Sequence, residues 1–212
     1  MSALAFFLLT LQTMAIHHHM QGMAGGTPQI ADELSLFNHH FAGWLLVLTG
    51  SFACLEESPL RQERRWVRYL WPAPLIFLAF YLLLRSDSEY LRSLAASHIL
   101  ASPEALQHKL AALLALGIGI IELLRRAGKI EHLGWSYILY AGMVAGGLFL
   151  LFHGGHHSDG VHQQHLVMGL TAIAIGAAKA LGDLFPKQGW LRFAALPGLL
   201  IALGTELVRY WE

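Results

Sequence analysis

Six long apolar stretches, separated by short polar segments, set the pattern of this chain. Their interiors consist largely of Leu, Ala, Gly, Ile and Phe, without the apolar–polar alternation that indicates strands. Each stretch is long enough to cross about 30 Å of hydrocarbon as a helix. We expect these helices over Leu36–Leu55, Val67–Arg85, Glu104–Arg126, Gly134–His153, His162–Asp183 and Trp190–Tyr210. The sequence therefore predicts an all-α fold, a polytopic membrane helical bundle of about six transmembrane helices.

The composition supports a bilayer as the surrounding medium. Hydrophobic residues make up 55% of the 212 residues and charged residues only 13%, about half of the share found in soluble domains. The formal net charge is zero with histidine neutral, so the sequence gives no reason to expect a nucleic acid partner. Cys54 is the only cysteine, which excludes an intrachain disulfide and a thiolate metal cluster. Any metal site must therefore use His, Met and carboxylate ligands.

The basic residues predict how the bundle is oriented. Ten of the fourteen lie in segments that alternating helices bring to one side: Arg61, Arg64, Arg65, Arg68, Arg125, Arg126, Lys129, Lys179, Lys187 and Arg192. Only Arg85, Arg92, Lys109 and Arg209 lie on the other side. The excess of basic residues makes the first side cytoplasmic. On that side Glu122 lies one turn from Arg125 and Arg126, so we expect an interfacial ion pair there.

The histidines are distributed in the opposite way. Twelve of the thirteen fall on the side that is poor in basic residues: His17, His18, His19, His39, His40, His98, His108, His153, His156, His157, His162 and His165. Only His132 falls on the basic side. A single histidine at a helix end is most often an interfacial polar residue, but this one-sided distribution indicates a shared role. Imidazole is the commonest protein ligand of transition metals, so we expect a metal or haem site at this face.

Four histidines stand on four different helices at comparable depth, and we expect them to converge. They are His40, His108, His153 and His165. Further candidate ligands are His39, His156, His157, His162 and Met168, where His162, His165 and Met168 recur every three residues and so share roughly one helix face. Asp159 and Glu206 are the acids available as outer-sphere partners, and Glu206 is preferred because an ionisable residue within a span is usually functional.

Residues 1–35 are expected to form a separate segment. Ala3–Leu11 is apolar but too short to span, and no basic residue precedes it. Two interpretations stay open: a signal segment with cleavage near Thr13-Met14-Ala15, or an uncleaved interfacial segment. His17, His18, His19, Met20 and Met23 follow, a mixture of imidazole and thioether that suits copper. We expect this tail to capture copper and pass it inward.

The histidine segments resemble those of the CopD-like copper-resistance membrane proteins. The resemblance is carried by Asn38-His39-His40-Phe41-Ala42-Gly43, Gln107-His108-Lys109, Phe152-His153-Gly154-Gly155-His156-His157 and His162-Gln163-Gln164-His165-Leu166-Val167-Met168-Gly169. It implies a protein of the bacterial inner membrane, with its histidine face in the periplasm, that binds copper and could transfer it across the membrane. A periplasmic copper carrier or a larger membrane complex is the partner that such a role would call for. No ATPase motif is present, so active pumping by this chain alone is not expected.

Other functions remain open on the same residues. Histidines on facing helices also suit a bis-His haem b in an electron-transfer protein, although the basic half of the bundle lacks the histidines that a second haem would need. The spacing His153–His157 matches one di-iron histidine box, whereas such enzymes need several, and a zinc hydrolase would need an acid such as Asp159 or Glu206 beside three ligands. A structural subunit of a larger complex is the remaining alternative. Copper fits best, and zinc and iron fit less well. Enzymatic activity stays open, with a non-enzymatic role favoured.

Overall fold

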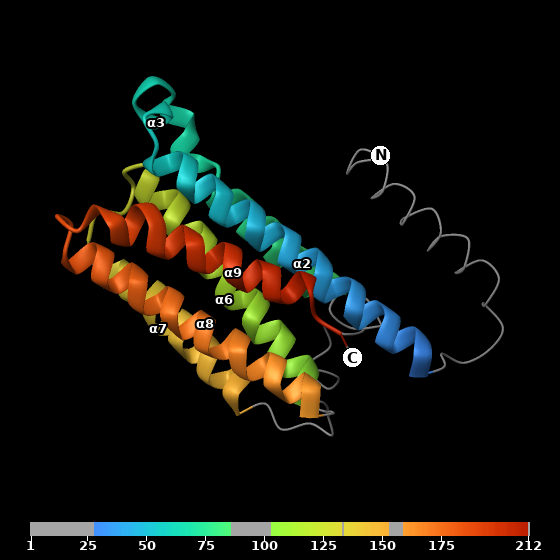
Figure 1. Ribbon diagram of the computed structural model, residues 1–212. Coiled ribbons are helices and arrows are strands. Elements are labelled where there is room, and N and C mark those ends of the chain that lie inside the picture. The colour runs from blue at the N-terminus through green and yellow to red at the C-terminus, as the bar shows by residue number, and fades with distance from the viewer. Residues whose placement is uncertain (1–27, 86–102, 133, 153–158, 212) are drawn as a thin grey trace. The chain divides into compact units, whose positions relative to one another are not determined.

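The computed structural model describes residues 28–85, 103–132, 134–152 and 159–211 (Figure 1). The chain divides into two compact units, unit 1 (Met1–Glu33) and unit 2 (Leu34–Glu212). Several candidate ligands lie outside the described residues: His17, His18, His19, Met20, Met23, His153, His156 and His157. The tail over 1–27 lies outside them as well.

Helices account for all the regular structure of the described ranges, which confirms the predicted all-α fold. The six longer helices are α2 (Pro28–Glu57), α4 (Pro72–Arg85), α6 (Pro103–Arg126), α7 (Gly134–Leu151), α8 (Asp159–Leu184) and α9 (Leu196–Val208). Three short elements connect them: α3 (Leu60–Glu63), the 3₁₀ turn η1 (Arg65–Tyr69) and the π-helical turn η3 (Leu191–Ala195). The last of these leads directly into α9, whose first turn contains Pro197.

Five helical segments of the described ranges are long and apolar enough to cross a membrane. They are Arg65–Arg85, Leu106–Arg126, Gly134–Leu151, Gly160–Leu184 and Leu191–Val208, and they match the last five predicted spans. The first predicted span lies within α2, but this helix is not among the five. Its apolar run is short because Asn38, His39 and His40 precede it and Glu56 and Glu57 follow it.

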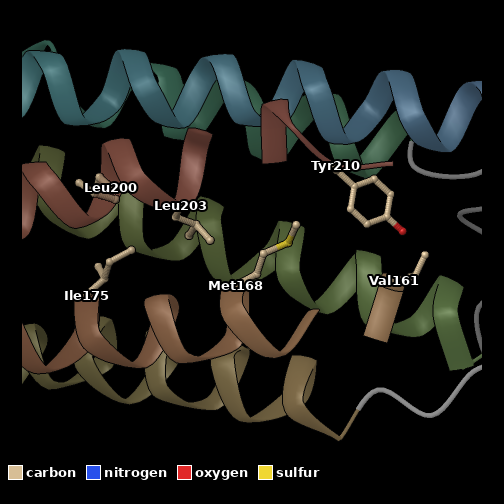
Figure 2. Packing of buried hydrophobic residues seen from close by; sticks show 6 residues of the cluster. All are labelled: Val161, Met168, Ile175, Leu200, Leu203 and Tyr210. Atoms are coloured by element: carbon tan, nitrogen blue, oxygen red, sulfur yellow. The ribbon is translucent and has the colours of Figure 1, made fainter. Parts of the chain in front are cut away.

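The core of the bundle lies largely between α8 and α9. Helix α7 also packs along α8, and α4 packs along α6. Val161, Met168 and Ile175 recur every seven residues along α8 and therefore form one stripe. Figure 2 shows Met168 and Ile175 pointing from α8 toward Leu203 and Leu200 of α9. All of these side chains are buried, so the two helices share a continuous apolar seam.

Glycines allow two pairs of helices to approach closely. A β-carbon on Gly147 of α7 would lie 2.5 Å from the carbonyl oxygen of Gly169 on α8. A β-carbon on Gly204 of α9 would lie 2.7 Å from the carbonyl oxygen of Gly43 on α2. Neither distance is compatible with a side chain, so both crossings depend on small residues, as is common where helices pack in membranes.

Successive long helices run in opposite directions, which gives unit 2 two chemically different ends. Asn38 of α2 donates through Nδ2 to the carbonyl of Arg85, the last residue of α4, at 3.1 Å. Arg126, the last residue of α6, bonds Glu56 in the last turn of α2. We call the end at which Asn38 bonds Arg85 the histidine end, because it holds His39, His40, His108, His162 and His165. The end at which Arg126 bonds Glu56 is the basic end, because it holds Arg68, Arg125, Arg126, Lys179 and Arg192.

Candidate functional site

Two adjacent histidines at the histidine end each donate a ring N–H to a backbone carbonyl. His40 Nε2 lies 2.9 Å from the carbonyl oxygen of Tyr210, and His39 Nδ1 lies 2.8 Å from that of Ser35. A carbonyl oxygen only accepts, so these hydrogen bonds fix the tautomers of the two rings. The basic nitrogen is then Nδ1 in His40 and Nε2 in His39. Histidines that bind metals are commonly held in this way, with one ring N–H on a carbonyl.

Tyr210 is the residue around which these imidazoles gather. The His39 ring stacks on the Tyr210 ring with centroids 3.9 Å apart, and the His165 ring lies 5.9 Å from it. Tyr210 is only 3% exposed and His165 only 7%. Nearby, the side chain of Gln164 bonds both the N–H and the carbonyl of Trp211. Polar side chains of α2 and α8 therefore hold the segment that follows α9, at Tyr210 and Trp211.

The remaining described candidates are less closely grouped. His108 of α6 has a buried Nδ1 atom with no hydrogen-bond partner among the described residues. Met168 is buried in the seam between α8 and α9 (Figure 2). The side chain of His162 is exposed, so it does not share the buried face of His165 and Met168. The buried face of α8 instead follows Val161, one residue earlier, because 161, 165 and 168 are spaced by one turn each.

Glu206 lies within α9, one turn before Tyr210, and faces α8. Its Oε1 atom accepts a hydrogen bond of 3.0 Å from the Thr171 hydroxyl. Its Oε2 atom is buried and has no hydrogen-bond partner in the described part of the chain. The carboxyl group is therefore only partly satisfied within an otherwise apolar segment.

The described histidines do not by themselves complete a metal site. Within the described ranges, no three His, Cys, Asp or Glu side chains lie close enough together to hold one metal ion. His40, His108 and His165 therefore do not form such a group without further residues. The fourth predicted ligand, His153, and the neighbouring His156 and His157 lie outside the described residues, as does the side chain of Asp159.

The basic end contains a network of ion pairs that joins two helices through Arg126. The guanidinium group of Arg126 bonds Glu56 of α2, with Nη2 to Oε2 at 2.7 Å, and also bonds Glu122 of its own helix. It lies 4.7 Å from the centre of the Trp71 ring. Glu122 is only 1% exposed and is bonded in addition by Arg125 at 3.2 Å. The predicted pairing of Glu122 with Arg125 and Arg126 is thus confirmed.

A second part of this network lies on α7 and α8. Lys179 Nζ bonds both carboxylate oxygens of Asp183, at 2.8 and 2.7 Å, and the Tyr140 hydroxyl donates to the same carboxylate. Arg125 Nη1 lies 3.9 Å from Oδ2 of Asp183, which links this part to α6. Sequence reasoning missed the participation of Glu56, Asp183 and Tyr140. The available signal was that charged residues stand near the ends of three apolar helices: acids alone in α2, and acids together with bases in α6 and α8.

No family model, no curated protein and no solved structure matches this chain.

Proposed function

We propose that this chain is a copper-binding protein of the bacterial inner membrane, with its histidine end in the periplasm. The observation that carries the proposal is the pair of hydrogen bonds from His39 and His40 to backbone carbonyls. In each imidazole the bond fixes the proton on one ring nitrogen and leaves the other nitrogen unprotonated, as a metal ligand requires. The bias of basic residues toward the other end supports the orientation.

A third imidazole, His165, lies against the same tyrosine as His39. Copper is the metal that best fits the available chemistry, because the candidate ligands combine imidazole with methionine and include no thiolate pair. We assign the completion of the site to the loop that carries His153, His156 and His157, and the delivery of copper to the tail with His17–His19, Met20 and Met23.

The test is copper binding by variants that remove a ligand but keep the hydrogen bond. In His40→Gln the amide can still donate to the Tyr210 carbonyl, whereas the basic Nδ1 atom is lost. We expect His40→Gln and His165→Gln each to weaken copper binding by about tenfold or more, since removal of even an outer partner of a metal ligand costs ~10–100-fold. His132→Gln is the matched control, because His132 is exposed at the basic end, where its Nδ1 atom accepts a hydrogen bond from the N–H of Gly134.

The readout is metal content by mass spectrometry together with a competition titration under reducing conditions. Deletion of residues 17–23 should lower copper uptake and leave the fold intact. Equal copper binding by His40→Gln, His165→Gln and wild type would contradict the proposal. A Soret band in the purified protein would contradict it in favour of haem b.

A further inference from the structure

A pocket of about 540 Å³ opens at the basic end of the bundle, at the opposite helix ends from His40, His108 and His165. Side chains from the ends of α2, α6 and α8 and from the turns η1 and η3 line it. The charged lining residues are Glu56, Glu57, Arg68, Glu122, Arg125, Arg126, Glu131, Lys179, Asp183 and Arg192. These are five acids and five bases, so the lining has no net charge.

Two of the five basic residues form no ion pair with an acid among the described residues. Arg125, Arg126 and Lys179 pair with Glu56, Glu122 and Asp183. The remaining bases, Arg68 and Arg192, bond only neutral groups among the described residues. Arg68 donates to the Tyr69 hydroxyl at 2.6 Å, and Arg192 donates to the carbonyl of Pro186 at 3.3 Å.

Both remaining guanidinium groups have a donor without an acceptor. The Nε atoms of Arg68 and Arg192 are buried and have no hydrogen-bond partner in the part of the chain that the structure describes. Buried donors are nearly always satisfied by protein, water or a ligand. The two arginines come from different elements, η1 and η3, and line the same pocket. Planar guanidinium groups are suited to phosphate, which accepts several parallel hydrogen bonds.

Exposed tryptophans indicate at what level this pocket lies relative to a membrane. Trp66, Trp135 and Trp190 are 56%, 44% and 61% exposed. They stand in η1, in the first turn of α7 and immediately before η3, so all three belong to the basic end. Tryptophan is enriched at the boundary between hydrocarbon and headgroups. Their position favours a pocket that opens near the level of the lipid headgroups.

We propose that this pocket binds the phosphate group of a phospholipid headgroup through Arg68 and Arg192. The neutral lining favours a lipid as the source of the phosphate, because it produces no net field that would draw a free anion from solution. A headgroup is instead brought to this level by the membrane itself. Glu57 and Glu131 line the pocket without an ion pair among the described residues, so they can face the ammonium group of a zwitterionic lipid.

The experiment compares two lipids that differ only in the headgroup. The purified full-length protein is delipidated in detergent and titrated with dioleoyl phosphatidylethanolamine or with dioleoylglycerol, which has no phosphate. Bound lipid is counted by native mass spectrometry, and thermal unfolding is followed in parallel. We expect binding and a rise in Tm with phosphatidylethanolamine only. Arg68→Gln and Arg192→Gln should each weaken this binding about tenfold, because each loses a charge-assisted hydrogen bond.

Arg64→Gln is the matched control, since Arg64 is exposed, lies beside η1 and is not part of the lining. Arg68→Lys keeps the charge and loses Nε, and its intermediate affinity would separate phosphate recognition from a folding defect. Equal binding of dioleoylglycerol, or unchanged phospholipid binding in the Arg68→Gln/Arg192→Gln double variant, would overturn the proposal. If inorganic phosphate alone reproduces the full rise in Tm, the phosphate site stands and its source is a soluble ligand, which overturns the assignment to a lipid.

Discussion

Arg126 is the residue on which the charged network at the basic end depends most. It bonds Glu56 and Glu122 at once, and both carboxylates are buried. In Arg126→Met the carboxylate of Glu56 would stay buried without its base, and that of Glu122 would keep only Arg125. We expect this change to destabilise the protein by about 3–5 kcal/mol, as when one partner of a buried ion pair is removed. Unfolding of the detergent-solubilised protein, by heat or denaturant, measures the effect.

Arg64→Met serves as the control for this prediction, because Arg64 is exposed. A surface substitution of this kind changes stability by only about 0.5 kcal/mol or less. If Arg126→Met and Arg64→Met unfold alike, the carboxylates of Glu56 and Glu122 are screened by water and the network contributes little.

Residue by residue, the sequence predicted what is local and missed what is not. The pairing of Glu122 with Arg125 and Arg126 was predictable, because residues three and four apart on a helix are neighbours. The pairing of Arg126 with Glu56 was not, since these residues are 70 positions apart and meet only after α2 and α6 have packed. The same limit applies to the histidine end, where the carbonyl of Tyr210 is 170 positions from His40. No spacing rule could have indicated that contact.

At the scale of elements, the crossing of α7 and α8 depends on two facing glycines. In Gly147→Ala the new methyl group would meet the carbonyl oxygen of Gly169 at 2.5 Å and the backbone N–H of Ile173 at 3.0 Å. These are backbone atoms and cannot rotate away, so the helices must move apart. We expect a loss of about 1–3 kcal/mol of stability, the usual effect of overpacking a core. Thermal unfolding measures it.

Gly117→Ala provides the opposite case within α6. A β-carbon on Gly117 meets nothing within 4 Å, and alanine favours a helix interior over glycine by about 0.5–1 kcal/mol. This variant should therefore be neutral or slightly more stable than wild type. A loss of stability in Gly117→Ala equal to that in Gly147→Ala would show that the response does not depend on the close crossing of α7 and α8.

The boundaries of the elements were largely predictable because apolar length is a strong signal. The five spans from Arg65–Arg85 to Leu191–Val208 coincide with predicted stretches. Helix α2 is the exception, since polar residues at both of its ends leave a shorter apolar run between Phe41 and Leu55. Side chains among these polar residues bond other parts of the bundle. Asn38 bonds the last residue of α4, His40 bonds the segment just after α9, and Glu56 pairs with the last residue of α6. Helix α2 therefore connects the two ends of the bundle through side chains as well as through packing.

At the scale of the whole molecule, the two ends differ in chemistry, and this difference predicts how the protein sits in its membrane. Ten of the fourteen basic residues belong to the basic end or its connecting segments, so we expect this end in the cytoplasm. Single cysteines introduced on a Cys54→Ser background would report each end separately. Gly189 suits the basic end, because a side chain there meets nothing within 4 Å, and Phe152, 82% exposed, suits the other end.

In intact cells, a membrane-impermeant maleimide should label Phe152→Cys and leave Gly189→Cys unlabelled until the inner membrane is permeabilised. The reason is that positive charge on short loops is retained on the cytoplasmic side, whereas histidine, largely neutral at pH 7, crosses more readily. The copper proposal requires this orientation, since its ligands must face the periplasm, whereas the lipid pocket is compatible with either leaflet. Labelling of Gly189→Cys alone in intact cells would therefore contradict periplasmic copper binding and leave phosphate recognition by Arg68 and Arg192 unaffected.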